Sequence, residues 1–409
     1  MSLSDEKSFL KSGHLPTLFA AFMYFDASFM CWVLLGPLGI QISKALNLDP
    51  AHKGLMVAVP VLAGAFLRIL NGVLVDHFGA KRTGVGAQVF VILGLTAAWY
   101  FGVPSFAEVL LLGVVLGMAG ASFAVALPMA SRWYPPQHQG KALGLAGAGN
   151  SGTVIAALFA PALGLYFGWV NVFGLTALLM SLILVAFIVL AKEAPTQPPK
   201  QSLAGYLKVL AIADTWWFML FYAVTFGGFV GLASSLGIYF HAQYGLAPVQ
   251  AGYAVAACVF AGSMFRPIGG LIADKFGGIR ALSILYLVAA AMLILVSVGL
   301  PTLTMALSAF VVAMLALGTG NGAVFQLVPV RFGREIGVMT GLVGFAGGIG
   351  GFYLASSLGY SKQWTGSYQA GFLIFAGLAL VAFIGINVVK KSWRASFSKG
   401  VTDMDQVRI

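Results

Sequence analysis

The chain has few charged residues: 23 basic and 12 acidic side chains among 409 positions, or 9%. A water-soluble domain carries about a quarter charged residues. The shortage is matched by 60% hydrophobic residues and a mean hydropathy of +0.94. So little charge cannot cover the surface of a soluble globule, which excludes a soluble enzyme, a nucleic-acid-binding protein and a disordered scaffold. The composition predicts a polytopic membrane protein.

Cysteine and histidine are also scarce. Cys31 and Cys258 both lie in apolar runs, which excludes a disulfide framework and a thiolate metal site. The five histidines are scattered along the chain with no paired spacing. The sequence contains no nucleophile–base pair and no nucleotide-binding loop either. We therefore expect no metal, no cofactor and no enzymatic activity.

Long apolar runs take up most of the remaining sequence. A membrane-spanning helix needs about 20 apolar residues. The runs between proline, glycine and charge clusters predict twelve such helices, over residues 15–43, 52–76, 82–101, 106–131, 141–167, 169–191, 212–241, 248–274, 280–299, 302–330, 336–360 and 367–390. The polar, proline-rich stretch 192–202 divides these helices six and six.

Lysine and arginine are unevenly distributed over the predicted loops. With the N-terminus in the cytoplasm, 18 of the 23 fall on the cytoplasmic side, and only Lys44, Lys53 and Lys362 fall on the opposite side. Such an excess is the usual signal for the orientation of a membrane protein. It predicts that both termini are cytoplasmic, and it explains the net charge of +11 without nucleic acid. The remaining two, Arg68 and Arg266, lie within apolar helices.

The two halves of the chain repeat one another. Three pairs of segments recur: RILNGVLVDHFGAKR at 68–82 with RPIGGLIADKFGGIR at 266–280, GKALGLAG at 140–147 with GVMTGLVG at 337–344, and Gly117 and Pro128 with Gly318 and Pro329. Their offsets are 198, 197 and 201 residues. We therefore predict two pseudo-symmetric six-helix bundles, with bounds 1–191 and 209–390, a cytoplasmic linker at 192–208 and a cytoplasmic tail at 391–409. In transporters built from such repeats the substrate site lies near the midplane, where the halves meet.

Arg68 and Arg266 occupy equivalent positions in the two halves, each about 12 Å inside the cytoplasmic boundary at 1.5 Å per residue. A charge at this depth marks a functional site by default. Only one acidic residue, Asp26, lies well inside a predicted span, so protein carboxylates cannot neutralise both arginines. A bound anion would supply the missing charge. The planar guanidinium suits a small, flat oxyanion, although phosphate and carboxylates also bind arginine.

Several motifs resemble those of known transporters. The loop GVLVDHFGAKR and its second copy GLIADKFGGIR resemble the signature of the major facilitator superfamily. The glycine-rich stretches GLAGAGNSG at 144–152 and GLVGFAGGIGG at 341–351, together with the two arginines, resemble the nitrate/nitrite porter family within that superfamily. The resemblance runs from residues 22–38 to residues 318–329 and so covers essentially the whole chain. It implies the major facilitator fold.

The resemblance also implies the residues of a substrate site. It assigns anion binding to Arg68, Arg266, Asn150, Tyr222, Phe123 and Phe226. Counted from the helix ends, Asn150, Tyr222 and Phe123 are each about 14 Å deep, level with the arginines. Without the resemblance the two phenylalanines would be read as packing, because the chain contains 32 of them. The six positions are therefore predicted to meet in one layer.

Other residues are predicted to act in the conformational change or in its coupling. Asp76 and Asp274, in the two loop motifs, are expected to hold helices together in one conformational state. Glycines at short spacing let helices approach closely and slide. The glycines in question are Gly144, Gly147, Gly149, Gly341, Gly344 and Gly347. Asp26 either carries a coupled proton or is a permanent partner for an arginine or a helix end.

Together these features predict a secondary active transporter of nitrate, and of nitrite, that works by alternating access. We expect proton-coupled nitrate uptake; the alternatives are nitrate/nitrite antiport and transport of another small anion such as formate or oxalate. A nitrate receptor is disfavoured because the tail after residue 390 has only 19 residues. The expected setting is a monomer in the lipid bilayer of the plasma membrane, the inner membrane of a bacterium.

Overall fold

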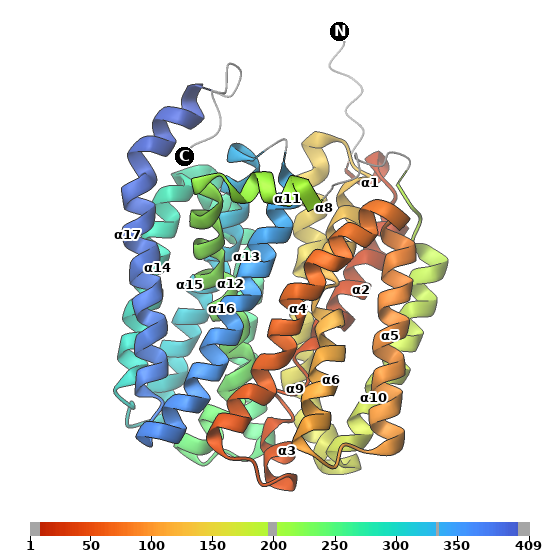
Figure 1. Cartoon of the computed structure of the whole chain (residues 1–409), viewed down its shortest axis with the longest axis vertical. Helices are drawn as coiled ribbons and strands as arrows, with labels where there is room; N and C mark the ends of the chain where they lie inside the picture. The colour runs from red at the N-terminus through yellow and green to blue at the C-terminus, as the bar shows by residue number, and fades with distance from the viewer. Residues whose placement is uncertain (1–8, 195–202, 333–334, 400–409) are drawn as a thin grey trace.

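The computed structural model describes residues 9–194, 203–332 and 335–399, and the regular structure in these ranges is entirely helical (Figure 1). Twelve helices among these residues are long and apolar enough to cross a membrane. Their most apolar windows have mean hydropathies between 1.2 and 2.8. The predicted all-α membrane fold with twelve spans is confirmed.

The first half of the chain contains helices with breaks. Its elements are α1 (Phe9–Ser12), α2 (Leu15–Trp32), α3 (Gly39–Ala45), α4 (Pro50–Phe78), α5 (Ala80–Phe101), α6 (Phe106–Gly120), α7 (Phe123–Ser131), α8 (Pro136–Gly147), the 3-10 helix η1 (Ala148–Ser151), α9 (Gly152–Phe167) and α10 (Trp169–Leu190). One membrane span consists of α6 and α7, and another of α8, η1 and α9. Low helix propensity of glycine, asparagine and serine accounts for both breaks, in GMAGAS at 117–122 and in GNSG at 149–152.

The second half of the chain is more regular. Its elements are α11 (Leu203–Leu210), α12 (Ala213–Tyr244), α13 (Pro248–Phe276), α14 (Gly278–Ser297), α15 (Leu303–Arg331), α16 (Ile336–Thr365) and α17 (Gln369–Lys399). From α12 onward each is a single helix long enough to span the membrane. Tyr222, Arg266 and Gly344 are therefore presented from the interior of uninterrupted helices.

The sequence predicted three boundaries incorrectly. The first span was expected to run to residue 43, but α2 ends at Trp32 and α3 begins after a turn that contains Pro37, which lacks a helical N–H donor. The expected linker includes the helix α11. The last helix continues to Lys399, because Trp393 is 1% exposed and packs on Phe218 with ring centroids 4.8 Å apart. Hydropathy locates the end of the apolar run, whereas this helix is extended by packing.

Residues with positive φ mark the same turns in both halves. Among the described residues they are Asn47, Gly79, Gly102 and Gly168 in the first half, and Gly245, Gly277, Gly299 and Gly366 in the second. The matched pairs are 198, 198, 197 and 198 residues apart. A left-handed backbone favours glycine and, after it, asparagine. The turns between helices thus repeat as a set, and the predicted pseudo-symmetry of the two bundles is confirmed.

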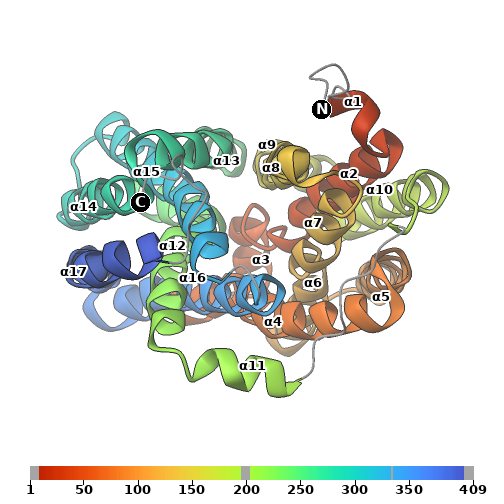
Figure 2. The ribbon, with the colours of Figure 1, turned by 90° about the horizontal axis from the view of Figure 1, so that it is seen from above.

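The two bundles lie side by side, as Figure 2 shows from above. The end of the molecule that carries α1 and α11 is called here the α11 side, and the end that carries α3 is called the α3 side (Figure 1). Between the bundles α4 packs against α16, and α9 packs against α13. On the α3 side a Cβ atom on Gly54 would lie 2.8 Å from the Gly359 Cα, so glycine allows the two backbones to touch.

We expect Gly54→Val to disrupt this contact between α4 and α16. Overpacking of this kind costs about 1–3 kcal/mol, so the midpoint of thermal unfolding in detergent should fall. Gly377→Val is the matched control, because a Cβ atom at Gly377 in α17 has no heavy atom within 4 Å. Equal midpoints for the two variants would contradict the close approach.

Candidate functional site

Arg68 is a buried arginine that connects the two bundles. It lies in α4 and is 2% exposed. Its Nη1 donates to the carbonyl oxygen of Gly344 in α16 at 2.8 Å, and its Nη2 donates to the carbonyl oxygen of Gly120 at 2.9 Å. Gly120 ends α6, and the Ala124 N–H donates to Ala121 instead of continuing the helical ladder. The break after α6 therefore leaves a carbonyl group available to the guanidinium.

Arg266 lies in α13, in the second bundle, and faces the same aromatic ring as Arg68. The Phe123 ring centroid is 5.2 Å from the Arg68 Cζ and 5.7 Å from the Arg266 Cζ. Arg266 Nη2 donates to the hydroxyl oxygen of Tyr222 at 3.4 Å. Tyr222 is buried in α12 and stacks on Phe226, with centroids 5.1 Å apart and ring planes inclined by 3°. Of the six residues predicted to bind the anion, these contacts bring together five.

Two further aromatic residues belong to this cluster and were missed from the sequence. Trp32, at the end of α2, lies 5.9 Å from the Arg68 Cζ and stacks on Phe226. Phe325 in α15 lies 5.9 Å from the Arg266 Cζ, and its centroid is 5.0 Å from that of Tyr222. The internal repeat offered a signal for the second, since an offset of 201 carries Phe123 to Val324, the neighbour of Phe325.

No carboxylate among the described residues neutralises either arginine. Within the described ranges the ion pairs are His52–Asp49, Arg132–Asp76 and Arg331–Asp214. Arg68 Nε and Arg266 Nη1 are buried and have no hydrogen-bond partner in the same ranges. Aromatic faces attract cations, but more weakly than a carboxylate attracts them when both are buried. The cluster therefore favours a bound anion. The same ranges contain no group of three or more side chains suited to a metal ion.

Asn150 lies in the break between α8 and α9. It belongs to η1 and is 1% exposed, and its Oδ1 is buried with no hydrogen-bond partner among the described residues. Its carbonyl oxygen accepts hydrogen bonds from the hydroxyls of Thr153 and, at 3.4 Å, Ser263 of α13. Across the described part of the chain no hydrogen bond joins Asn150 to either arginine. The structure places it at the interface of the bundles, with an amide oxygen free to bond.

Asp26 contacts the same helix break from α2. Ser151 Oγ donates to its Oδ1 at 2.6 Å, and the Gly152 N–H at the start of α9 donates to the same carboxylate. Asp26 forms no ion pair with an arginine in the ranges that the structure describes. These contacts suit a partner for a helix end, and the role of Asp26 in proton coupling stays a prediction. The contact also ties the carboxylate to the irregular segment of the fifth span.

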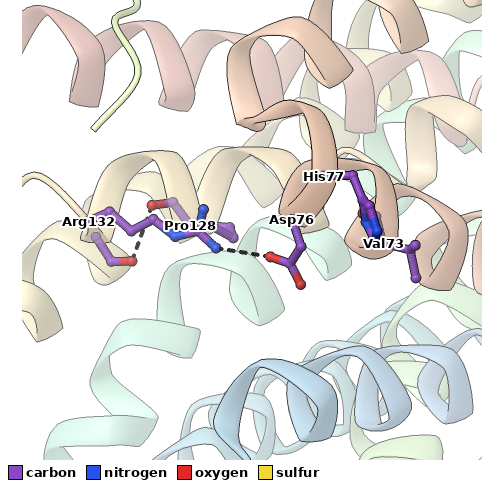
Figure 3. A network of polar contacts seen from close by, with 6 residues as sticks. Val73, Asp76, His77, Pro128 and Arg132 are labelled. Carbon is purple, nitrogen blue, oxygen red and sulfur yellow. Dashed lines mark hydrogen bonds and ion pairs between the residues drawn. The ribbon is translucent and has the colours of Figure 1, made fainter. Parts of the chain in front are cut away.

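The loop-motif carboxylates Asp76 and Asp274 have different environments. Figure 3 shows Arg132, at the end of α7, reaching Asp76 near the end of α4, and the distance between Nη2 and Oδ1 is 3.4 Å. Asp274 is exposed and belongs to no ion pair among the described residues. The duplication thus preserved both carboxylates in the sequence, but among the described residues only Asp76 forms an ion pair.

The C-terminal bundle contains an ion pair, between Arg331 and Asp214, that was not predicted from the sequence. Arg331, the repeat counterpart of Arg132, donates from Nε to Asp214 Oδ2 at 2.6 Å. The Trp393 indole N–H donates to Asp214 Oδ1 at 2.8 Å. Asp214 therefore joins the first turn of α12 to the end of α15 and to α17. A carboxylate beside a polar linker gives no signal in the sequence, because charge is ordinary there.

The glycines predicted to act in sliding fall into two groups. A Cβ atom on Gly344 would lie 2.8 Å from the Arg68 Cδ, and one on Gly347 would lie 2.8 Å from rings of Tyr222 and Phe226. At Gly149 it would lie 2.6 Å from the Phe25 ring. Gly144 and Gly147, nearer the α11 side, have no such neighbour within 4 Å. Gly341 is half-buried in α16, about one turn before Gly344. Gly344 and Gly347 therefore make room for residues that are predicted to bind the anion.

Comparison with known sequences gives matches over most of the chain. Residues 18–355 match the profile of the Major Facilitator Superfamily. The chain is 31% identical over 359 residues to the "Nitrite extrusion protein" of Bacillus subtilis, with 88% of this chain and 90% of that protein covered. It is 32% identical over 364 residues to the "Probable nitrate/nitrite transporter NarK2" of Mycobacterium tuberculosis, with 87% and 91% covered.

Comparison with solved structures shows the fold alone. A bacterial homolog of the human lysosomal transporter Spinster, in an inward-facing and occupied conformation, superposes with a TM-score of 0.71. The match covers 92% of this chain and 97% of that chain at 18% sequence identity.

Asp214 is paired and Asp274 forms no ion pair among the described residues, and this contrast can be tested with one matched substitution. We expect Asp214→Asn to lower the free energy of unfolding by about 1.5–3 kcal/mol, the usual contribution of a hydrogen bond to a charged group. Asp274→Asn should leave it nearly unchanged. Thermal unfolding of both variants in the same detergent measures the difference, and an equally large effect of Asp274→Asn would contradict the assignment.

Proposed function

Because the chain belongs to the Major Facilitator Superfamily and, within it, to the nitrate/nitrite porter family, we propose that it transports nitrate and nitrite across the membrane by alternating access. The printed names of the two relatives, one for nitrite extrusion and one for nitrate/nitrite transport, support these substrates. The observation that carries the proposal is the pair of arginines around Phe123, which no carboxylate neutralises in the described ranges. A small anion between them offsets part of this positive charge.

The shape of the anion fits this site. Nitrate is flat and carries its charge on three oxygens in one plane, so it can accept paired hydrogen bonds from a guanidinium fork. On the two arginines, Nε of Arg68 and Nη1 of Arg266 are buried donors that have no partner among the described residues. Tyr222 and Asn150 supply further polar atoms, and Phe123 and Phe226 supply flat faces. We propose that these six residues hold the anion.

The same charges provide a reason for the conformational change. Two cations on opposite bundles repel when nothing lies between them, and an anion draws them together. Arg68 already reaches across the interface to Gly344 of α16, so a change at the arginines is transmitted to this helix. Gly344 and Gly347 leave no side chain to obstruct movement of α16 past Arg68, Tyr222 and Phe226. We propose that binding favours closure and that the bundles then rock to expose the other side.

We also propose the orientation and setting of the protein. The loop pattern of the sequence assigns 18 lysines and arginines to the side that carries the described helix α11, and only three to the α3 side. The positive-inside rule therefore places both termini in the cytoplasm of a cell whose plasma membrane holds the protein. The site uses residues from both bundles of one chain, so a monomer suffices.

Replacement of either arginine by lysine tests the two-arginine site. Lysine keeps the charge but loses the planar fork, so Arg68→Lys and Arg266→Lys should each weaken nitrate binding about 10- to 100-fold, the equivalent of about 1.5–3 kcal/mol. Calorimetric titration of the purified variants gives the dissociation constant. Arg280→Lys, at an exposed position in α14, is the control. Near-normal affinity in either variant, at an unchanged unfolding midpoint, would exclude this site.

Coupling is a separate part of the proposal. Nitrate uptake against an inside-negative potential costs about 2.3 kcal/mol per charge for each 100 mV. Nitrate cannot carry a proton itself, because it is the anion of a strong acid. We propose that Asp26 takes up the coupled proton, since it is bonded to Ser151 in the break of the fifth span, where a change of charge alters the backbone beside Asn150. Nitrate/nitrite exchange, which needs no titrating group, is the competing mechanism.

The two mechanisms separate in proteoliposomes that contain Asp26→Asn. Proton coupling through Asp26 predicts that nitrate uptake driven by a pH gradient is lost while nitrate/nitrite counterflow is retained. Ser151→Ala is the control for the lost hydrogen bond and should keep gradient-driven uptake. If Asp26→Asn keeps that uptake, the carboxylate only caps a helix end. If the parent protein shows no dependence on the gradient, exchange is the mechanism.

A further inference from the structure

A cavity of about 360 Å³ opens between the two bundles on the α3 side. Lys44, Lys53, His241 and Lys362 line it, and so do Gly54 and Gly359 at the close contact of α4 with α16. These residues come from α3, α4, α12 and α16, so both bundles contribute. The cavity is distinct from the arginine cluster, because none of the proposed anion-binding residues lines it.

The cavity lies in line with the proposed anion site. Val57 in its wall and Arg68 are on the same helix, α4, and are about 16 Å apart at 1.5 Å per residue. α12 likewise carries Ser235 and Tyr239 in the cavity wall and Tyr222 in the site, and α16 carries Gly359 and Gly344. An anion that enters from the α3 side between these helices therefore meets the cavity before it meets the arginines.

The lysines that the loop pattern assigns to the α3 side all line this one cavity. Lys44, Lys53 and Lys362 are the three basic residues other than histidine that the loop pattern assigns to the α3 side, and all three line this cavity. Duplication does not account for this gathering. At the repeat offset of 198 their counterparts are Ala242, Ala251 and Gly164, none of which is charged.

Among the described residues no acidic side chain lines the cavity. Asp49 and Glu108 lie outside its lining, where Asp49 contacts His52 Nδ1 at 2.7 Å and Glu108 accepts a hydrogen bond from the Ser105 N–H at 2.9 Å. None of the three lysines belongs to an ion pair among the described residues. Lys362 Nζ donates to the carbonyl oxygen of Gly366 at 2.7 Å and keeps its full charge.

We propose that this lysine vestibule, formed by Lys44, Lys53 and Lys362, is an anion-collecting site that concentrates nitrate and nitrite ahead of the arginine site. This inference rests on the proposed function. Lysine is a strongly hydrated point charge without a planar fork, which suits loose and transient attraction, whereas the arginines suit tight and oriented binding. A recess lined by charge of one sign raises the local concentration of the opposite ion and its rate of association.

The vestibule affects the capture of nitrate and nitrite, and only of those anions that arrive from the α3 side. Removal of its charge should raise KM for nitrate presented to the α3 side and leave kcat unchanged. It should leave KM from the α11 side unchanged as well. The effect should also depend on ionic strength, because the Debye length falls from about 30 Å at 0.01 M to about 3 Å at 1 M salt. A structural role for the lysines would have neither dependence.

The experiment compares initial rates of labelled nitrate transport in proteoliposomes of known protein orientation. The test variant carries Lys44→Gln, Lys53→Gln and Lys362→Gln together, and the control carries Lys→Arg at the same positions, which keeps the charge. At low salt we expect about a tenfold higher KM for the glutamine variant from the α3 side. The parent and the arginine variant should approach its KM as inert salt is added. Single Lys44→Gln and Lys53→Gln variants, with smaller increases, replace the triple variant if it folds poorly.

The outcomes separate the inference from the function on which it rests. An unchanged KM in a glutamine variant, or a lowered kcat with unchanged KM, overturns the vestibule while nitrate transport by the parent stands. Equal changes in KM from both sides also overturn it. If the parent transports no nitrate, the proposed function fails and the vestibule, as a collector of its substrate, fails with it.

Discussion

Two guanidinium groups, that of the buried Arg68 and that of the half-buried Arg266, determine how this protein is arranged around its centre. No described carboxylate neutralises either of them. An unpaired buried ion costs several kcal/mol, and the structure offsets part of that cost. Arg68 donates to carbonyl groups from both bundles, and aromatic rings lie 5.2–5.9 Å from the two guanidinium carbons. In the proposed function the anion supplies the rest. Affinity and movement then have the same origin, because the force that draws in the anion is also the force between the bundles.

The two bundles contribute to this centre in different ways. The N-terminal bundle provides irregular backbone: α6 ends at Gly120, whose carbonyl binds Arg68, and the fifth span is interrupted at η1, which carries Asn150. The C-terminal bundle provides side chains from uninterrupted helices, with Tyr222 in α12 and Arg266 in α13. Asp214 fastens α12 to α15 and α17 in that bundle. The N-terminal bundle thus has interrupted helices at the site, and the C-terminal bundle has continuous ones.

The sequence predicted those parts of the molecule in which a residue contrasts with its surroundings. Arg68 and Arg266 are evident because a charge within an apolar run is rare. Trp32 and Phe325 were not predicted, because an aromatic side chain among 32 phenylalanines carries no contrast. The helix breaks near Gly120 and Asn150 were not predicted either. Hydropathy measures the length of an apolar run and does not show whether the backbone hydrogen bonds of the helix are continuous. Arg331 pairs with Asp214 and not with Asp274. This choice depends on packing at a helix end, which cannot be predicted from the internal sequence repeat.

The matching turns of the two bundles have a consequence for the origin of the site. Asn47, Gly79, Gly102 and Gly168 recur 197 or 198 residues later as glycines with positive φ, so the two bundles descend from one six-helix ancestor. A pseudo-twofold axis brings equivalent residues face to face where they lie close to it, as Arg68 and Arg266 do on Phe123. A single arginine in the repeated unit is therefore enough to give the paired form two like charges at its centre. The two arginines nevertheless have different partners, Gly120 and Gly344 for Arg68 and Tyr222 for Arg266.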